Sequence, residues 1–436
     1  MALNRGVKEI DHERMVAYSI LRSVEEEGSF SNLEINRALS KEEEALIDKA
    51  FVRKLVYGIL ERKLYLDYML DSFLKKGVDS VKADVLQILR MGAYQLEFME
   101  GVPDYAAIHT SVELLPKKYG GLKGFVNGVL RSYQRMLSQG SLPDLESLGK
   151  EERLSIRYSC GREIVDLLIN QYGYEETKSF LKELFDEYPL ELRVNLGKRS
   201  REEILDLLDG AEPSKMTKAG ITYSNQGERP ITETREYIEG LISIQSLGSC
   251  RIAEKSGAKA GDNIVDVCSA PGGKSLAMAE AMENQGKIIS MDLSGRRLSL
   301  LPKEAERLGI DIIETRVWDG SMVADDLVGW ADIVLVDAPC SGLGVMGTKP
   351  EIKYKDIEDG MAELIELQQN ILEASSNYLK KGGRLIYSTC TLNKKENQEQ
   401  IERFLKNHSE YKLIEEQLPL RDKEGRGRFY LAVMEK

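Results

Sequence analysis

Histidine is scarce in this chain of 436 residues, which contains only His12, His109 and His408. None of the three lies within metal-ligand spacing of another candidate ligand or beside a glycine-rich motif. Zinc sites and serine hydrolases use histidine as a ligand or as the general base. The sequence therefore gives poor support to both classes and predicts no metal site, so that any catalysis would depend on thiols and carboxylates.

Cysteine is also sparse. The chain has five, an odd number, widely spaced and without a CxxC pair: Cys160, Cys250, Cys268, Cys340 and Cys390. Small secreted domains that are held by disulfides carry dense and usually even sets of cysteines. The pattern argues against a disulfide framework and favours reduced thiols in a cytoplasmic protein.

Long apolar runs are missing as well, and the first ten residues contain no apolar signal core. No segment is apolar for the length that a membrane span needs. We therefore expect a cytoplasmic chain without a membrane partner. Its net charge of −12 lacks the basic footprint usual for proteins that bind nucleic acids, although local clusters such as Lys117 and Lys118 exist.

The first 140 residues carry apolar side chains at helical spacing, as in a compact helical bundle. Ser31 and Glu34 predict a capping box at the start of one helix. A stretch rich in Ser, Gly and Pro at 138–143 predicts a linker. The other helices are expected at 13–27, 49–63, 82–99, 106–115 and 124–136.

Two further domains are expected after this bundle. Residues 141–235 mix short helices and strands and predict a small α+β connecting domain. Residues 236–436 alternate strand and helix, which predicts an α/β fold with a doubly wound, Rossmann-like parallel sheet. Its strands are expected at 263–268, 287–293, 310–316, 331–338 and 383–390, its helices at 274–281, 294–308, 357–380 and 396–407, and late strands at 412–414 and 429–435.

A glycine-rich turn, Asp-Val-Cys-Ser-Ala-Pro-Gly-Gly-Lys, follows the first strand of this sheet at 266–274. Gly272 and Gly273 let the backbone approach a ligand at the start of a helix. Asp292 ends the second strand, where a carboxylate can accept hydrogen bonds from ribose hydroxyls. Asp319 follows the third strand and could reach the adenine. Each aspartate alone would read as a helix cap, but together with the turn they predict an adenosyl ligand, most simply S-adenosylmethionine.

Two cysteines stand where later strands of the same sheet end. Cys340 closes Asp337-Ala-Pro-Cys, and Cys390 closes Ser-Thr-Cys. Open parallel sheets bind ligands outside the carboxyl ends of their strands, so both thiols are expected in one crevice. A lone cysteine is more often a small buried hydrophobe. Two of them beside an adenosyl site instead predict a reaction that uses thiols.

Methylation of a pyrimidine ring needs such thiols. C5 of cytosine is a poor nucleophile until a thiolate adds to C6 and makes C5 electron-rich. The carboxyl group of Asp337 could ease the addition by hydrogen bonding at N3 and N4. A second thiol could remove the C5 proton after methyl transfer. These arguments leave open whether Cys340 or Cys390 attacks.

Residues 266–274, 337–340 and 389–390 resemble motifs of the RNA cytosine-C5 methyltransferases of the Nol/Nop/Sun family. The resemblance implies that Cys390 is the nucleophile, that Cys340 assists product release, and that Lys274 works beside Asp337. It also implies an S-adenosylmethionine site that consists of Cys268, Ser269, Ala270, Pro271, Gly272, Gly273, Lys274, Asp292, Asp319 and Asp337.

The N-terminal part is similar to a NusB-like RNA-binding domain, in the segments 18–22, 51–62, 88–96 and 125–131. This domain joined to the catalytic motifs is characteristic of bacterial 16S rRNA cytosine-C5 methyltransferases. The resemblance implies that 16S rRNA, free or at an early stage of assembly, is the partner. We expect a monomer, with domains at 1–140, 141–235 and 236–436.

Some loops depart from the family pattern, including residues 346–349, where relatives carry an arginine-rich loop, and Arg426-Gly-Arg-Phe429. Two alternatives therefore stay open. The first is the same chemistry on a cytosine of another rRNA or of a tRNA. The second is a non-catalytic RNA-binding or ribosome-assembly factor that uses the methyltransferase fold as a scaffold.

Overall fold

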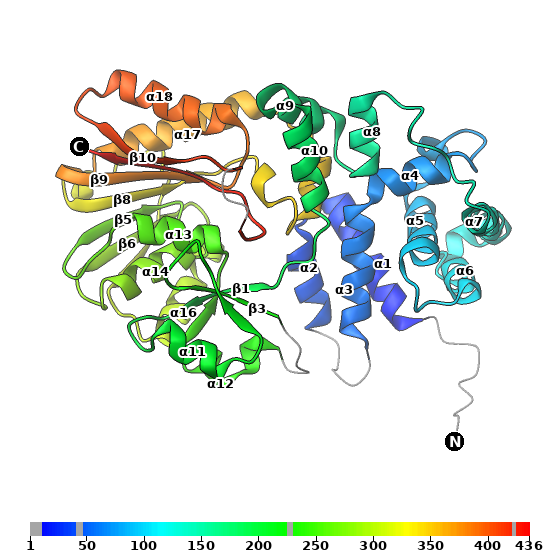
Figure 1. Cartoon of the computed structure of the whole chain (residues 1–436), viewed down its shortest axis with the longest axis horizontal. Coiled ribbons are helices and arrows are strands. Elements are labelled where there is room, and N and C mark those ends of the chain that lie inside the picture. Colours follow the sequence, from blue (N-terminus) through cyan, green and yellow to red (C-terminus); the bar gives the residue numbers. More distant parts are fainter. Residues whose placement is uncertain (1–10, 41–46, 225–229, 421–423) are drawn as a thin grey trace. The chain divides into compact units, whose positions relative to one another are not determined.

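A computed structural model describes residues 11–40, 47–224, 230–420 and 424–436. Its internal contacts divide the chain into two compact units (Figure 1). The helical unit contains residues 1–185 together with 349–356, and the catalytic unit contains residues 186–348 and 357–436. The predicted division into three domains, with boundaries at 140 and 235, stays a prediction.

The helical unit confirms the predicted all-α character of the N-terminal part. Its core is formed by aliphatic side chains such as Leu55, Ile59 and Ile88, which the helical spacing had placed on inner faces. Its helices are α1 (His12–Glu27), α2 (Ser31–Leu39), α3 (Lys49–Glu61), α4 (Lys63–Asp71), α5 (Ala83–Phe98), α6 (Asp104–Glu113), α7 (Lys123–Ser138), α8 (Lys150–Arg157), α9 (Arg162–Tyr172) and α10 (Tyr174–Glu183).

Two local predictions in this unit are wrong. The helix expected over 49–63 ends at Glu61, because Arg62 leaves the helical conformation (φ −122°) and α4 begins after it. Ser31 does not cap α2 but is its first residue, and no side chain caps the Phe30 position. The backbone amide and hydroxyl of Ser31 instead donate to Glu351 at 3.1 and 2.8 Å. A carboxylate distant in sequence thus replaces the local cap.

Glu351 belongs to a short insertion, residues 349–356, that contains a 3₁₀ helix (Pro350–Tyr354) and packs within the helical unit. Lys353 is buried there, and its ammonium group donates to the carbonyl of Glu61 at 2.7 Å. The hydroxyl of Tyr354 donates to the carbonyl of Leu60 and accepts from the amide of Lys63 at 3.2 Å. Burial lowers the pKa of Lys353 to about 8.

The main sheet of the catalytic unit has the strand order β10-β11-β9-β8-β5-β6-β7. The five strands from β9 to β7 pair in parallel, which confirms the predicted Rossmann-like fold. The late strands form one edge of the sheet, where β11 runs antiparallel to both β9 and β10, an orientation that the sequence did not indicate. The strands are β5 (Asn263–Val267), β6 (Lys287–Asp292), β7 (Ile313–Val317), β8 (Ala331–Asp337), β9 (Leu379–Thr389), β10 (Lys412–Gln417) and β11 (Tyr430–Glu435).

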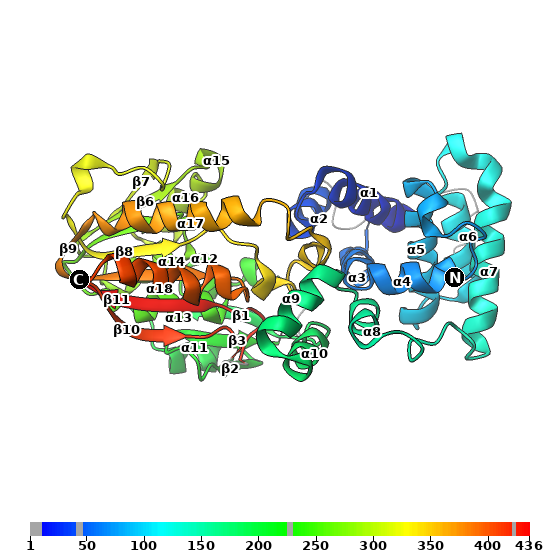
Figure 2. The same ribbon diagram turned by 90° about the horizontal axis from the view of Figure 1, so that it is seen from above.

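Helices cover both faces of this sheet, as Figure 1 shows. Alternate strand residues such as Val265 and Val267 pack with α17 (Met361–Ser376) and α18 (Gln398–Asn407), which lie over the strands in Figure 2. Ile264 and its neighbours pack with the helices of the other face: α13 (Leu247–Lys255), α14 (Gly273–Ala281) and α16 (Leu301–Leu308). The helix predicted at 294–308 is two helices, α15 (Gly295–Leu298) and α16, because Pro302 starts a new first turn.

A second, antiparallel sheet precedes α13 in the same unit, with the order β2-β3-β1-β4. It confirms that short strands occur within 141–235, whereas β4 had no clear sequence signal because it is only three residues long. Its elements are β1 (Leu190–Val194), α11 (Arg201–Leu207), β2 (Ala211–Pro213), β3 (Gly220–Tyr223), α12 (Arg235–Ile238) and β4 (Ile242–Ile244). Throughout the described residues, no helix has both the length and the apolar character of a membrane span.

The buried lysine of the insertion gives a test of this packing. Between pH 8 and its ordinary pKa of 10.5, Lys353 binds a proton in the unfolded chain but not in the folded one. Its contribution to stability therefore rises with pH, by about 1.4 kcal/mol per unit. Urea unfolding followed by circular dichroism should show wild type gaining stability relative to Lys353→Met between pH 8 and 9.5. The exposed Lys355→Met should follow wild type, and parallel curves for wild type and Lys353→Met would contradict the assignment.

Candidate active site

The predicted residues of the thiol site meet at the carboxyl edge of the main sheet. Strands β8 and β9 pair so that Asp337 lies opposite Ser388, at the ends of neighbouring parallel strands. Cys390 directly follows β9, and Cys340 follows β8 after Ala338 and Pro339. The side chain of Lys274 reaches the same edge from the first turn of α14. The expectation that these four groups share one place is confirmed, while their chemical roles stay predictions.

Asp337 is held by two donors. The ammonium group of Lys274 donates to one carboxylate oxygen at 2.6 Å, and the hydroxyl of Ser388 donates to the other at 2.8 Å. Burial lowers the pKa of Lys274, whereas the charge of Asp337 and the hydrogen bond to it raise this pKa. The raising effects together are larger, so the net shift is upward. Lys274 is therefore a fixed positive charge at neutral pH, and it orients the carboxylate.

The two thiols lie side by side, with a distance of 3.3 Å between the sulfur atoms of Cys340 and Cys390. A disulfide bond is about 2.05 Å long, so these are two separate thiol groups in hydrogen-bond contact. The hydrogen bond with Cys390, together with burial, raises the pKa of Cys340 well above its ordinary value. Cys340 is consequently a protonated thiol near neutral pH.

A buried carboxylate fixes the loop that carries Cys340. Glu396 accepts hydrogen bonds from the amide and hydroxyl of Ser341 at 2.8 and 2.6 Å. It also accepts from Gln368 at 3.0 Å and from Asn393 at 3.2 Å. These hydrogen bonds leave little freedom for Ser341, and hence for the adjacent thiol.

Gly344 ties the same loop to Cys390 through its backbone. Its amide donates to the carbonyl of Cys390 at 2.9 Å, and its carbonyl accepts from the amide of Arg428 at 2.9 Å. A Cβ at this position would overlap the carbonyl of Arg428, so only glycine allows the close approach. The backbone therefore joins both cysteine segments independently of the thiol contact.

The predicted adenosyl turn combines a backbone that requires glycine with polar groups that can bond a ligand. Gly272 has φ of +109°, and a Cβ there would overlap Leu301, so glycine is required in this turn. Asp292 accepts from the amides of Ala270 at 3.1 Å and Ser294 at 2.8 Å, which places its carboxylate beside the turn. The buried hydroxyl of Ser269 has no hydrogen-bond partner among the described residues. A hydrogen-bonding ligand in the turn fits these observations.

Asp319 is the one predicted cofactor residue that the described contacts do not join to this turn. It is exposed, and its carboxylate accepts from the amide and hydroxyl of Ser321 at 3.0 and 2.7 Å. These hydrogen bonds to Ser321 lower its pKa. Asp319 nevertheless follows β7, the strand that pairs with β6, so it stays on the ligand-binding edge of the sheet.

The sequence had given no role to several residues that support the site. Ser388 and Glu396 are two of them, since neither forms a recognisable spacing with the residue it holds. Arg193 is a third, buried in β1 and donating to both oxygens of Glu280 at 2.8 Å and to the carbonyl of Gly273 at 3.2 Å. It also donates to Gln245. The small sheet thus braces the glycine-rich turn, and only the three-dimensional structure shows this.

Residues 257–430 match the family described as 16S rRNA methyltransferase RsmB/F, and residues 11–135 match the NusB family. The chain is 35% identical over 414 residues to the probable ribosomal RNA small subunit methyltransferase B of Bacillus subtilis (strain 168), with 93% of this chain and 91% of that protein covered. This chain belongs to the small-subunit rRNA methyltransferase B family. The family resemblance expected from the motifs is confirmed.

Other comparisons agree with this family. The ribosomal RNA small subunit methyltransferase B of Escherichia coli O1:K1 / APEC is 29% identical over 440 residues, covering 97% of this chain and 98% of that protein. The crystal structure of a methyltransferase homologue from Pyrococcus horikoshii superposes with a TM-score of 0.57 at 25% identity, covering 66% of this chain and 99% of the other. The family is one of methyltransferases that use S-adenosylmethionine, which confirms the predicted cofactor.

Ser388 offers a test of how the carboxylate is positioned. Ser388→Ala removes one of the two donors to Asp337. It should lower kcat for methyl transfer about tenfold, which corresponds to the loss of one hydrogen bond. Ser376→Ala is the matched control, since that hydroxyl donates only to a backbone carbonyl within α17, of Glu373, at 2.8 Å. Both variants should lose similar stability in urea. Equal activity of the two would show that Ser388 does not position Asp337.

Proposed function

We propose that this protein transfers a methyl group from S-adenosylmethionine to C5 of a cytosine in 16S rRNA, through a covalent bond between Cys390 and C6. The observation that carries the proposal is the pair of thiols 3.3 Å apart beside the Lys274–Asp337 ion pair. Family membership supports the rRNA, because the curated relatives are named for the ribosomal RNA of the small subunit.

Cys390 is the proposed nucleophile. Its thiolate forms a bond to C6, and the electron pair of the C5–C6 double bond moves toward C5 and the ring. As a carboxylate, Asp337 would accept a hydrogen bond from a protonated N3 and stabilise its positive charge, and this charge draws electron density away from C6. Lys274 holds that carboxylate in place. The target base must leave its stack to reach these groups.

Cys340 is the proposed base for the second half of the reaction. The contact with Cys390 is the largest cause of its raised pKa. Once the sulfur of Cys390 is bonded to C6, it no longer carries negative charge, and this cause disappears. Cys340 can then release its thiol proton to solvent and, as a thiolate, take the proton from C5. The C5–H electron pair restores the C5–C6 double bond, and Cys390 leaves as a thiolate.

The glycine-rich turn is the proposed cofactor site. S-adenosylmethionine, when bound, supplies the electrophilic methyl group. Residues 268–274 would line one side of the cofactor with their backbone. The hydroxyl of Ser269, which has no partner among the described residues, would gain one. Asp292 would accept from the ribose hydroxyls, and Asp319 would lie on the adenine side. Asp337, at the end of the neighbouring strand β8, would face the reacting methyl group.

The test of function is transfer of a labelled methyl group from S-adenosylmethionine to unmodified 16S rRNA, followed by nucleoside analysis. We expect labelled 5-methylcytosine at one position, in free rRNA or in an early assembly intermediate. Label in another nucleoside would contradict the chemistry. Label only in another rRNA or a tRNA would overturn the substrate, and cofactor binding without any transfer would favour the scaffold alternative.

The roles of the two cysteines predict opposite effects of their substitution. Cys340→Ser should accumulate a protein–RNA adduct that survives denaturing gel electrophoresis, because the C5 proton is no longer removed. Cys390→Ser should form no adduct and no product. Cys250→Ser is the matched control, a buried cysteine of α13, and it should turn over without accumulation. The reverse pattern would exchange the roles of Cys340 and Cys390.

A further inference from the structure

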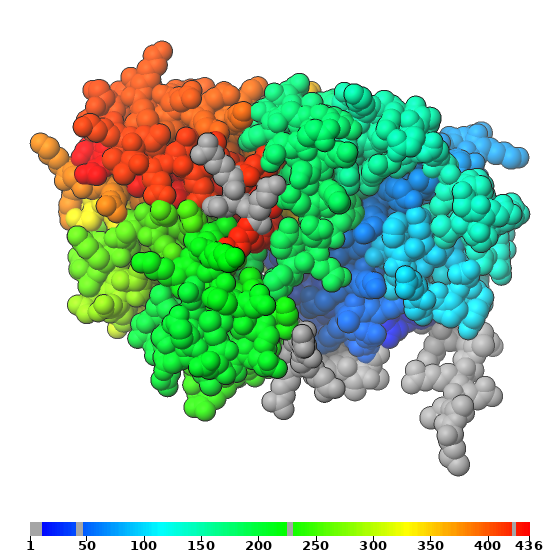
Figure 3. All heavy atoms as spheres, viewed as in Figure 1, coloured from blue at the N-terminus to red at the C-terminus, as the bar shows by residue number. Residues whose placement is uncertain are grey.

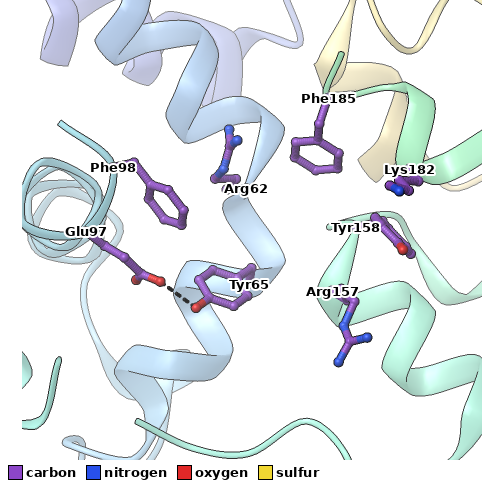
Figure 4. Close-up of a pocket in the computed structure, with 8 residues that line it drawn as sticks. All are labelled: Arg62, Tyr65, Glu97, Phe98, Arg157, Tyr158, Lys182 and Phe185. Atoms are coloured by element: carbon purple, nitrogen blue, oxygen red, sulfur yellow. Dashed lines mark hydrogen bonds between the residues drawn. The ribbon is translucent and has the colours of Figure 1, made fainter. Parts of the chain in front are cut away.

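The helical unit contains a pocket of about 340 Å³, whose lining includes none of the residues of the thiol site (Figure 4). Its volume is at the lower end of the range of small-molecule sites. Four aromatic side chains line it: Tyr65, Phe98, Tyr158 and Phe185. In Figure 4 the first two come from α4 and α5, and the other two from the opposite wall, after α8 and α10. Aromatic faces on two sides are suited to hold a planar group.

The polar lining of the pocket is mainly cationic. Arg62, Arg157 and Lys182 contribute positive charge, and Glu97 is the single acid among the lining residues. Arg157 also pairs with Glu146 at 2.6 Å, and Arg62 with Glu61 at 3.2 Å, so their charges are partly neutralised. The exposed Lys182 adds its charge at the rim. Cations around aromatic faces suit a planar group that carries a negative charge.

The pocket is organised before any ligand binds. Glu97 accepts a hydrogen bond from the hydroxyl of Tyr65 at 2.6 Å, and a second from the buried hydroxyl of Tyr133. The guanidinium of Arg62 lies 4.8 Å from the ring centres of both Phe98 and Phe185. Such cation–π contacts hold the arginine and both rings in one arrangement. Little side-chain freedom therefore has to be lost on binding.

We propose that this pocket binds one unpaired nucleotide of the RNA substrate, with its base between the rings of Tyr65 and Tyr158 and its phosphate toward Lys182 and Arg157. Proteins recognise single-stranded RNA by stacking bases on aromatic or guanidinium planes and by cationic contacts to phosphate. Because the chain has a net charge of −12 and no overall basic character, binding of RNA depends on local cationic sites of this kind. The inference rests on the proposed RNA substrate.

The pocket is not a property of the NusB-like part alone. The match to the NusB family covers residues 11–135, which include Arg62, Tyr65 and Phe98 but neither Tyr158 nor Lys182. The second wall comes from the helices that follow, α8 and α10, which reach the surface in the view of Figure 3, coloured teal to green. The site therefore needs both segments, and it would give this chain an RNA contact that its NusB-like part by itself does not have.

The test is binding of the full chain to two end-labelled 12-nucleotide probes, oligouridylate and oligoadenylate, which contain no target cytosine. Tyr158→Leu should weaken binding of at least one probe about five- to hundredfold, the range for loss of one base–aromatic stack. The control is Tyr105→Leu, an exposed tyrosine of the same unit, and its affinity should equal that of wild type. Unchanged affinity of Tyr158→Leu for both probes would overturn the proposal.

Salt dependence tests the interaction with phosphate. Lys182→Gln should make the slope of log K against log salt shallower by about 0.7, as expected when one phosphate of a single strand is no longer neutralised. Lys178→Gln removes the same charge from the same helix, one turn away and outside the pocket, and should leave the slope unchanged. Equal effects of the two variants would indicate diffuse attraction and would overturn the role assigned to Lys182.

The methyl-transfer assay separates this inference from the proposed function. If wild type forms 5-methylcytosine while Tyr158→Leu keeps the wild-type KM and probe affinity, the function stands and the pocket proposal fails. If no 5-methylcytosine is formed but probe binding still depends on Tyr158 and Lys182, the pocket binds RNA and the proposed reaction fails. A pocket role in methylation would raise KM with little change in kcat.

Discussion

The pairing of β8 with β9 is the constraint on which the site depends. Both strands lie in the interior of the sheet, and their register sets Asp337 opposite Ser388. The two cysteines follow these strand ends, so the same register brings their sulfur atoms to 3.3 Å. Because side chains alternate between the faces of a sheet, a slip of one residue would move every core side chain of a strand to the other face. The packed helices on both faces exclude such a slip.

Much of this arrangement could be predicted from the sequence. Apolar runs such as residues 333–336 mark buried parallel strands, and the glycines after β5 mark a turn that approaches a ligand. Strand ends in a parallel sheet share one edge, so Asp292, Asp337 and the two cysteines could be assigned to it in advance. This rule depends only on the parallel direction of the strands, so it can be applied before any side-chain contact is known.

What the sequence could not show depends on contacts between distant segments. Glu351 takes the place of a capping side chain for Ser31, although the two are 320 residues apart. Glu396 and Arg193 act on the site through other residues, and their spacing from them follows no periodic pattern. Short elements such as β4 and the break at Arg62 are decided by packing rather than by propensity. The antiparallel β11 has the same apolar pattern that a parallel strand would have.

Because of the insertion at 349–356, neither compact unit is one continuous stretch of the chain. The polypeptide passes between the two units at 185–186, again at 348–349 and once more at 356–357. A segment 1–185 on its own would lack the lysine and tyrosine that bond the carbonyls of Glu61 and Leu60. A catalytic segment that begins at residue 186 would still contain Lys353 and Tyr354, but without the carbonyls that they bond. The helical part is therefore complete only in a chain that extends to residue 356, and a truncation at the first unit boundary, after residue 185, removes part of it.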